Sequence, residues 1–271
     1  MLPEPRVAIL QTGRLGDIWI TLPMAYYLHQ KGIQVDCYYD ARYGNPFSFT
    51  PYVNPKPVIL PDWIKLKNRW GYALNEAIHQ ARLLVWLKCR YSRVIWRQVF
   101  PYRWLKVAWD KRPGIRFYDP FPEVPHLQAH TTLVCSNDRT ILLFCRSQSV
   151  RFDQDAKHHQ WIEDNLQHLV QATGYTPVHV AFGNEPDHPK YRTWRGNLDD
   201  YQRLIAGCGI VYGITTSAHA FAQLIGKANV HLHGGPHLSY NQIGNETAWL
   251  HPHDQLTVEQ IVEIKRKIGL I

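Results

Sequence analysis

The chain has 271 residues, of which 45% are hydrophobic and 19% charged, and its formal net charge is +8. This composition and the many aromatic residues exclude a largely disordered chain, and no uninterrupted apolar run reaches the ~18 residues of a membrane span. The N-terminus lacks the charged-then-apolar layout of a secretory signal, so we expect a cytoplasmic protein of one large domain or two smaller ones.

The first half of the chain has the pattern of a parallel α/β domain. Short apolar runs alternate with helical periodicity, and Gly13 and Gly16 permit a sharp turn after the first run. In chain order we predict a strand at 7–10, a helix capped by Asp17, a strand at 33–39, a loop at 40–61 with a short strand at 58–60, and a helix at 72–97.

A second α/β pattern follows a proline-rich segment. Three prolines between residues 119 and 130 predict a connection between domains. We then predict strands at 140–145, 177–182, 210–212 and 229–232, and helices at 160–172, 198–208, 218–225 and 257–268. The chain therefore divides into domains at 1–125 and 126–255 and a C-terminal helix at 256–271. An apolar stripe on that helix (Val258, Ile261, Ile264 and Ile268) gives it the option of packing back on the N-terminal domain.

The positive charge is concentrated in residues 65–116. This segment holds thirteen Lys and Arg residues against two acidic ones, and five of the ten tryptophans. Basic residues interleaved with aromatic ones suit a nucleic-acid groove or an anionic membrane surface. The plain alternative is a set of helices with aromatic core faces and solvated Arg side chains. The size of the excess favours contact with a polyanion.

The first motif with chemical potential is the turn Gly13-Arg14-Leu15-Gly16-Asp17. Its glycines allow a ligand to approach the backbone, and the start of a helix offers N–H groups. The turn is neither G-x-G-x-x-G nor a P-loop. Asp17 is either a plain helix cap or a carboxylate that takes a proton from an acceptor hydroxyl.

The second motif is GITTSAH at residues 213–219, between a predicted short strand and a helix. Three hydroxyls and consecutive N–H groups at a helix start suit a diphosphate, which the helix dipole also favours. The plain alternative is a capping sequence that binds nothing.

These two segments resemble glycosyltransferase family 9, the heptosyltransferase-like proteins. The stretch GRLGDIWITLP matches the family's Gly-Asp-x-x-x-Thr-x-Pro, and GITTSAH is similar to its Asp-Thr/Ser-Gly-x-x-His loop. The resemblance implies a GT-B fold of class α/β: two Rossmann-like domains with parallel sheets facing a central cleft, the acceptor against the first domain and the donor nucleotide in the second. With His219 aligned, Ile214 stands where the family has Asp and Thr216 where it has Gly.

The resemblance also implies roles for individual residues. Asp17 is then the general base of an inverting, metal-independent transfer. Acceptor-binding candidates come from the first motif and from the basic segment (Arg14, Thr21, Trp96 and Arg97). The donor-binding candidates begin with Gly16. Arg146 and Lys157 are the two cations beside the departing diphosphate, and Glu185 is the acid that binds the nucleotide ribose. The remaining candidates belong to the second motif (Thr215, Thr216, Ser217 and His219).

A metal or a resident cofactor is not indicated. The fifteen histidines contain no H-E-x-x-H, and the five cysteines contain no C-x-x-C pair. We therefore predict no metal site and no cofactor beyond a nucleoside-diphosphate sugar as co-substrate.

Together these features predict a nucleotide-sugar-dependent glycosyltransferase with a polyanionic acceptor. That acceptor is either DNA with hydroxymethylated bases, as in viral DNA glycosyltransferases, or a lipopolysaccharide-core or surface glycan on an anionic glycolipid. The alternative is a non-catalytic module on the same scaffold that binds nucleic acid or a partner. We expect no transmembrane segment and a cytoplasmic location, with peripheral contact at the inner membrane face for a glycolipid acceptor and the host cytoplasm for a viral enzyme.

Overall fold

The computed structural model describes residues 6–13, 15–59, 69–96, 132–145, 156–214, 216–232 and 247–271, with side chains described except at 69–77 and 156–158. The chain divides into two compact units, and the described residues up to 96 fall in the first and those from 133 in the second. Each unit holds one sheet in which all pairings are parallel. The predicted α/β class with two parallel sheets is confirmed, whereas the predicted boundary at 125 lies outside the described residues.

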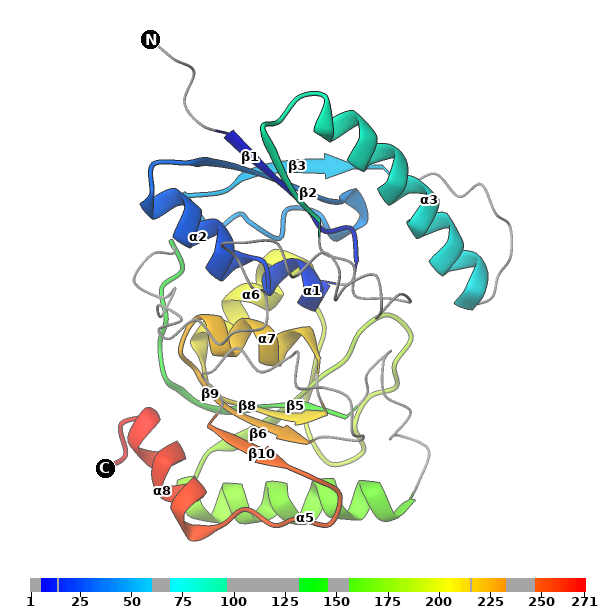
Figure 1. Ribbon diagram of the computed structural model, residues 1–271. Coiled ribbons are helices and arrows are strands. Elements are labelled where there is room, and N and C mark those ends of the chain that lie inside the picture. Colours follow the sequence, from blue (N-terminus) through cyan, green and yellow to red (C-terminus); the bar gives the residue numbers. More distant parts are fainter. Residues whose placement is uncertain are drawn as a thin grey trace. The chain divides into compact units, whose positions relative to one another are not determined.

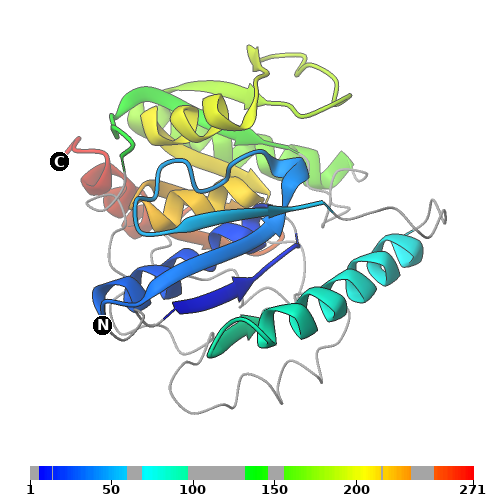
Figure 2. The same ribbon diagram turned by 90° about the horizontal axis from the view of Figure 1, so that it is seen from above.

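The first unit is a four-stranded sheet of order β3-β2-β1-β4 with helices on both faces. Side chains alternate between the faces: Ala8, Leu10 and Tyr38 pack with Leu84 and Leu87 of α3, while α2 lies against β2 on the other side (Figure 2). The elements are β1 (Arg6–Leu10), α1 (Leu15–Trp19), α2 (Leu22–Gln30), β2 (Gln34–Asp40), the 3-10 turn η1 (Ala41–Tyr43), β3 (Asn54–Val58), α3 (Arg69–Lys88) and β4 (Arg93–Trp96).

Three predictions in this unit are wrong in detail. The predicted helix at 72–97 ends at Lys88, and its last residues form β4, because Trp96 pairs with Leu10 of β1. The short strand predicted at 58–60 lies earlier, as β3, where two prolines are tolerated because β3 is an edge strand. The helix after Asp17 is broken into α1 and α2 around Thr21, whose hydroxyl donates to the Ile18 carbonyl oxygen at 2.6 Å.

The second unit is a six-stranded sheet of order β10-β9-β8-β5-β6-β7. Helices α6 and α7 cover one face, and α5 and α8 cover the other (Figure 1). The elements are β5 (Asp138–Phe144), α5 (Ala156–Thr173), β6 (Thr176–Val180), β7 (Thr193–Trp194), α6 (Leu198–Gly207), β8 (Cys208–Ile214), α7 (Ser217–Leu224), β9 (Ala228–Leu232), β10 (Ala248–Leu250) and α8 (Val258–Lys267). The short strands β7 and β10 were not predicted.

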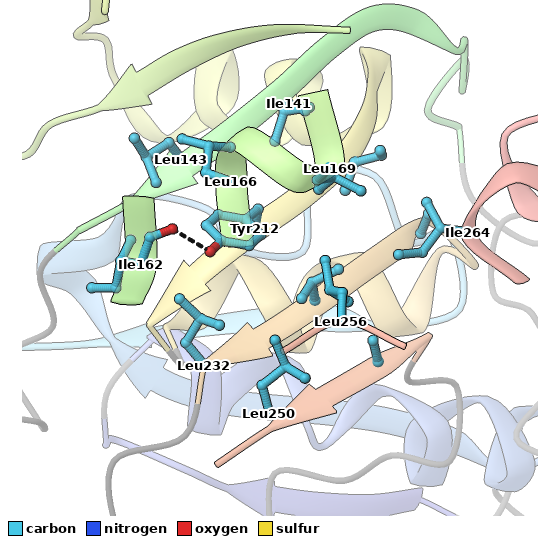
Figure 3. Close-up of a cluster of buried hydrophobic side chains, with 14 of the residues drawn as sticks. Ile141, Leu143, Ile162, Leu166, Leu169, Tyr212, Leu232, Leu250, Leu256 and Ile264 are labelled. Carbon is cyan, nitrogen blue, oxygen red and sulfur yellow. Dashed lines mark hydrogen bonds between the residues drawn. The ribbon is translucent and has the colours of Figure 1, made fainter. Parts of the chain in front are cut away.

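The main core of this unit lies between the sheet and the α5–α8 layer (Figure 3). Tyr212 is fully buried there, and its hydroxyl donates to the Ile162 carbonyl oxygen at 2.6 Å. Figure 3 shows Leu232 and Leu250 of the sheet on the same side as Leu256 and Ile264. Apolar contacts therefore fix α5 and α8 against the strands, and the opposite face is left to α6 and α7.

The apolar stripe predicted on the C-terminal helix is largely buried. Ile261, Ile264 and Ile268 lie in the core of the second unit. Val258, at the first helical position, is 73% exposed and does not belong to the buried face. Of the described helices, none has the length and apolar character needed to cross a membrane.

Candidate active site

The Gly13 turn follows the carboxyl end of β1, the edge at which parallel α/β sheets bind ligands. The Gly13 N–H donates to Oε1 of Gln11 at 3.0 Å. A Cβ atom on Gly13 would lie 2.9 Å from that oxygen and 3.2 Å from Oδ2 of Asp17, so the Asp17 carboxylate lies close to the turn. Gln11 is buried, and its Nε2 has no hydrogen-bond partner in the described part of the chain. A buried donor left without a partner costs about 1–3 kcal/mol, which points to more than a structural turn.

Polar side chains of β4 and α3 hold the residues beside this turn. Gln80 is fully buried and donates to the Thr12 hydroxyl at 2.7 Å, and its Oε1 accepts from the Trp96 indole at 2.8 Å. Trp96, predicted as an acceptor-binding residue, therefore donates its N–H within the protein, and its half-buried side chain packs against the core of this unit. Gln80 was not predicted, because a single Gln in a helix is an ordinary residue that no sequence pattern singles out.

Of the other acceptor-binding candidates, the structure describes only Thr21. Thr21 is fully buried, with its hydroxyl on the Ile18 carbonyl, so it supports the break between α1 and α2 and does not face a ligand. Arg14 and Arg97 lie outside the described residues. Gly16, assigned to the donor, lies in α1 next to Asp17 and belongs to the first unit.

In the second unit, the late motif forms the turn between β8 and α7, as predicted. Gly213 has φ of +130°, and a Cβ atom there would lie 2.2 Å from the Phe144 carbonyl oxygen of β5. Thr216 is the N-cap of α7, and its hydroxyl accepts from the Ala218 N–H at 3.3 Å. Ile214, at the position where family 9 has Asp, is a buried core residue.

His219 is placed differently from the prediction. Its ring is fully buried; Nδ1 accepts from the Thr216 N–H at 3.3 Å, and Nε2 donates to the Val230 carbonyl at 3.2 Å. Because an N–H only donates and a carbonyl only accepts, these contacts fix the neutral tautomer with the proton on Nε2. Burial lowers the pKa of His219 to about 4. His219 therefore holds the turn and does not contact a ligand directly.

The same contacts correct the expectation of consecutive N–H groups. The N–H groups of Thr216, Ala218 and His219 all bond within the turn. Within the described residues, the Ser217 N–H and the positive end of α7 have no partner in this turn and are placed to meet an anion, while the Ser217 hydroxyl lies 3.4 Å from that of Tyr201. Thr215 and Arg146 lie outside the described residues, as does the side chain of Lys157, which is located in the first turn of α5.

Tyr201 of α6 lies at this turn although the sequence did not single it out. It is buried, its hydroxyl is 3.4 Å from the Ser217 hydroxyl, and burial raises its pKa. The rings of Phe144, Phe182 and Trp194 surround its own at 4.9–6.4 Å between centroids. Phe182 is 45% exposed, so one edge of this aromatic group reaches solvent beside the carboxyl end of β6.

Glu185 lies in the turn that follows β6, close to Phe182. Its Oε2 accepts from the Phe182 N–H at 3.3 Å, and its Oε1 lies 3.4 Å from Nε2 of His179. Its side chain is 12% exposed. This donor candidate is therefore held at the carboxyl edge of the second sheet, the same edge as Ser217.

In the described part of the chain, no three His, Cys, Asp or Glu residues are arranged so that they could hold a metal ion. His231, which the sequence paired with His233 on one strand, is fully buried. Its Nε2 accepts from the Gln223 amide at 2.9 Å, and its ring lies between those of His219 and Trp249. His231 therefore packs within the protein.

Neither a family model nor a curated protein matches this sequence. Among solved structures, the E. coli heptosyltransferase WaaC with ADP is similar at a TM-score of 0.58 and 16% identity, over 98% of this chain and 99% of that one. The E. coli ADP-heptose lps heptosyltransferase II is similar at 0.60 and 14% over the same shares. A glycosyl transferase family 9 protein from Veillonella parvula is similar at 0.56 and 11%, over 100% of this chain and 94% of that one.

These similarities extend over nearly the whole chain and define the fold as GT-B, as the sequence predicted. At 11–16% identity they establish the fold alone, and the activity is argued from the residues of the site.

Proposed function

We propose that this chain is a glycosyltransferase that moves a sugar from a nucleoside diphosphate to a hydroxyl of a polyanionic acceptor. The observation that carries the proposal is the Asp17 carboxylate beside the Gly13 turn, at the carboxyl end of β1 in a GT-B fold. A carboxylate there suits a general base, and the neighbouring buried Gln11 Nε2, which has no partner among the described residues, offers a donor beside it.

In the proposed reaction the acceptor oxygen attacks the anomeric carbon of the donor sugar while Asp17 accepts the hydroxyl proton. The bond between that carbon and the diphosphate oxygen breaks from the opposite side, so the configuration inverts. The leaving diphosphate keeps the electron pair. Ser217 and the start of α7 stabilise its charge, with Arg146 and Lys157 as the cations and without a metal. Glu185 accepts hydrogen bonds from the nucleotide ribose.

For the donor and acceptor, we propose ADP-heptose and a lipopolysaccharide-core or surface glycan. Support comes from the similarity of the fold to two E. coli heptosyltransferases. One is the structure of WaaC with ADP, and the other is the ADP-heptose lps heptosyltransferase II. The end of α3 adds an exposed cationic surface that suits an anionic glycolipid at the inner membrane face: Arg82, Lys88, Arg90 and Arg93 are exposed, and Arg90 lies 4.0 Å over the Trp86 ring.

The same cationic and aromatic surface also suits DNA, so DNA with hydroxymethylated bases is the second candidate acceptor. A viral enzyme that acts on such DNA would work in the host cytoplasm. Gel shifts of duplex DNA at two salt concentrations, set against binding to vesicles with anionic lipid, separate the two acceptors. Binding to DNA with steep salt dependence and no binding to vesicles would replace the glycan proposal.

The catalytic proposal is tested with Asp17→Asn, assayed for sugar transfer from ADP-heptose and from UDP- and GDP-sugars. Loss of a general base should lower kcat about 10²–10⁴-fold and leave the thermal shift produced by the donor nucleotide unchanged. Asp199→Asn is the matched control, since Asp199 is an exposed carboxylate in the first turn of α6.

Asp17 is not the predicted N-cap, because α1 begins at Leu15 and Asp17 lies within its first turn. Two results would reject the assignment. If kcat falls no further in Asp17→Asn than in Asp199→Asn, the Asp17 carboxylate serves only that helical turn. If the wild type transfers no sugar from any of these donors, the alternative of a non-catalytic binding module, motivated by Ile214, takes its place.

A further inference from the structure

We propose that His179 and Thr193 are positioning residues that orient the Glu185 carboxylate, and that this orientation makes the site select a ribonucleotide over a 2′-deoxyribonucleotide. The inference rests on the proposed function in one respect, namely that the second unit binds the nucleotide of the donor.

The geometry begins with the pairing of β6 and β7, which places Thr193 directly opposite His179. The Thr193 hydroxyl accepts from the His188 N–H at 3.0 Å and lies 3.2 Å from Nδ1 of His179. A carboxylate only accepts, so the Nε2 that faces Glu185 is the ring nitrogen expected to carry a proton. In the neutral ring with that tautomer, Nδ1 is the acceptor and the Thr193 hydroxyl is its donor.

Nε2 of His179 lies 3.4 Å from Oε1 of Glu185, an ion-pair distance, and the His179 side chain is only 3% exposed, so the ring has little freedom to turn away. The second carboxylate oxygen accepts from the Phe182 N–H at 3.3 Å. The Thr193–His179 chain thus fixes one oxygen and the backbone fixes the other, an arrangement in which outer residues lock the rotamer of a ligand-binding group.

The turn that carries Glu185 is itself clamped. The Glu185 N–H donates to the Phe182 carbonyl at 3.1 Å, and Gly183 between them has φ of +55°. The Arg195 guanidinium donates to the Gly183 carbonyl at 3.1 Å and also to the Glu185 carbonyl. The backbone is therefore set before any ligand arrives, and the remaining freedom is the rotation of the carboxylate, which His179 restricts.

The chemistry of the free positions indicates the ligand. An ionised carboxylate offers about four acceptor positions; the Phe182 N–H takes one of them, and His179 lies beside the other oxygen. The positions that remain suit two adjacent hydroxyl donors, which is what the 2′- and 3′-hydroxyls of a ribose present. Phe182, exposed on the same turn, supplies an apolar ring beside them. Removing the 2′-hydroxyl from the nucleotide should then weaken its binding. Removing the residues that orient the Glu185 carboxylate should abolish the difference in affinity between the ribonucleotide and the 2′-deoxyribonucleotide.

The test compares the dissociation constants of ADP with 2′-deoxy-ADP, and of UDP with 2′-deoxy-UDP, by calorimetry. We expect the wild type to prefer the ribonucleotide about tenfold or more, because hydrogen bonds to charged groups are the stronger class. In His179→Phe, which keeps a ring but removes both nitrogens, the ratio should approach one. In His179→Gln, whose amide reaches the position of Nε2, most of the preference should return.

His188→Phe is the matched control, because the His188 ring stacks on Tyr191 and packs beside His179 without approaching Glu185. It should keep the wild-type ratio. Thr193→Val, which preserves the branched shape of the side chain, covers the case in which His179→Phe does not fold, and it should lower the ratio as well.

An unchanged ratio in folded His179→Phe or Thr193→Val would overturn the inference, as would a wild type that binds both nucleotides equally. In either case sugar transfer by the wild type would leave the proposed function standing. A wild type that binds no nucleoside diphosphate and transfers no sugar would instead remove the proposed function and this inference with it.

Discussion

Replacing Gly213 with alanine should be among the most damaging single-methyl changes in this protein. Gly213 pairs with Phe144 across β8 and β5, and a Cβ atom would lie 2.2 Å from the Phe144 carbonyl oxygen and 2.9 Å from its carbonyl carbon. Backbone atoms cannot rotate away as a flexible side chain can, so the two strands must separate. Overpacking of this kind costs about 1–3 kcal/mol.

The backbone conformation adds a second cost at the same residue. With φ of +130°, Gly213 occupies a region that L-residues rarely adopt, for a penalty of about 1–3 kcal/mol. Together the two effects predict a loss of about 2–6 kcal/mol of unfolding free energy, which is comparable with much of the stability of an ordinary domain.

Gly174→Ala separates the two contributions. Gly174 also has a positive φ, of +70°, but nothing lies within 4 Å of a Cβ atom there. We expect it to cost about 1–2 kcal/mol from conformation alone. Urea unfolding of both variants followed by circular dichroism provides the comparison. Equal destabilisation by the two substitutions would refute the close approach of β8 to β5.

Two further predictions concern the interior of the second unit. The pKa of His219 is lowered to about 4 in the folded protein, so the unfolded chain takes up a proton at this residue first as the pH falls. The unfolding free energy should therefore be unaffected by His219 above about pH 6.5. It should fall by up to about 3 kcal/mol as the pH drops from 6.5 to 4. Urea midpoints at pH 7.5 and 4.5 should therefore differ more for wild type than for His219→Gln, and equal differences would contradict the neutral, buried ring. Tyr212→Phe should lower the unfolding free energy by about 1–2 kcal/mol, since it leaves the buried Ile162 carbonyl without this donor; an unchanged midpoint in urea would show that the bond contributes nothing.

Sequence reasoning located the strands at the centre of each sheet. The segments that form β1, β5 and β8 are apolar over several residues and buried along most of their length, and such runs carry their own signal. The short strands β4, β7 and β10 were not predicted, and β3 was predicted a few residues too late. β3 contains two prolines, and β4 continues the apolar spacing of α3, so each is defined by the neighbour it pairs with and not by its own pattern.

The candidate site shows the same division. Asp17, Ser217 and Glu185 lie next to the carboxyl ends of strands, where glycines and capping residues in the sequence placed them. Other features depend on contacts between different elements of the fold. These are the burial of the His219 ring against β9, the contact of Tyr201 with the α7 turn, and the pairing of His179 with Thr193. Local patterns therefore determined the order of the elements and the turns that join them, because φ preferences, caps and apolar periodicity act over a few residues. Which polar atoms meet across those turns was decided by packing, since only the folded sheet brings their strands together.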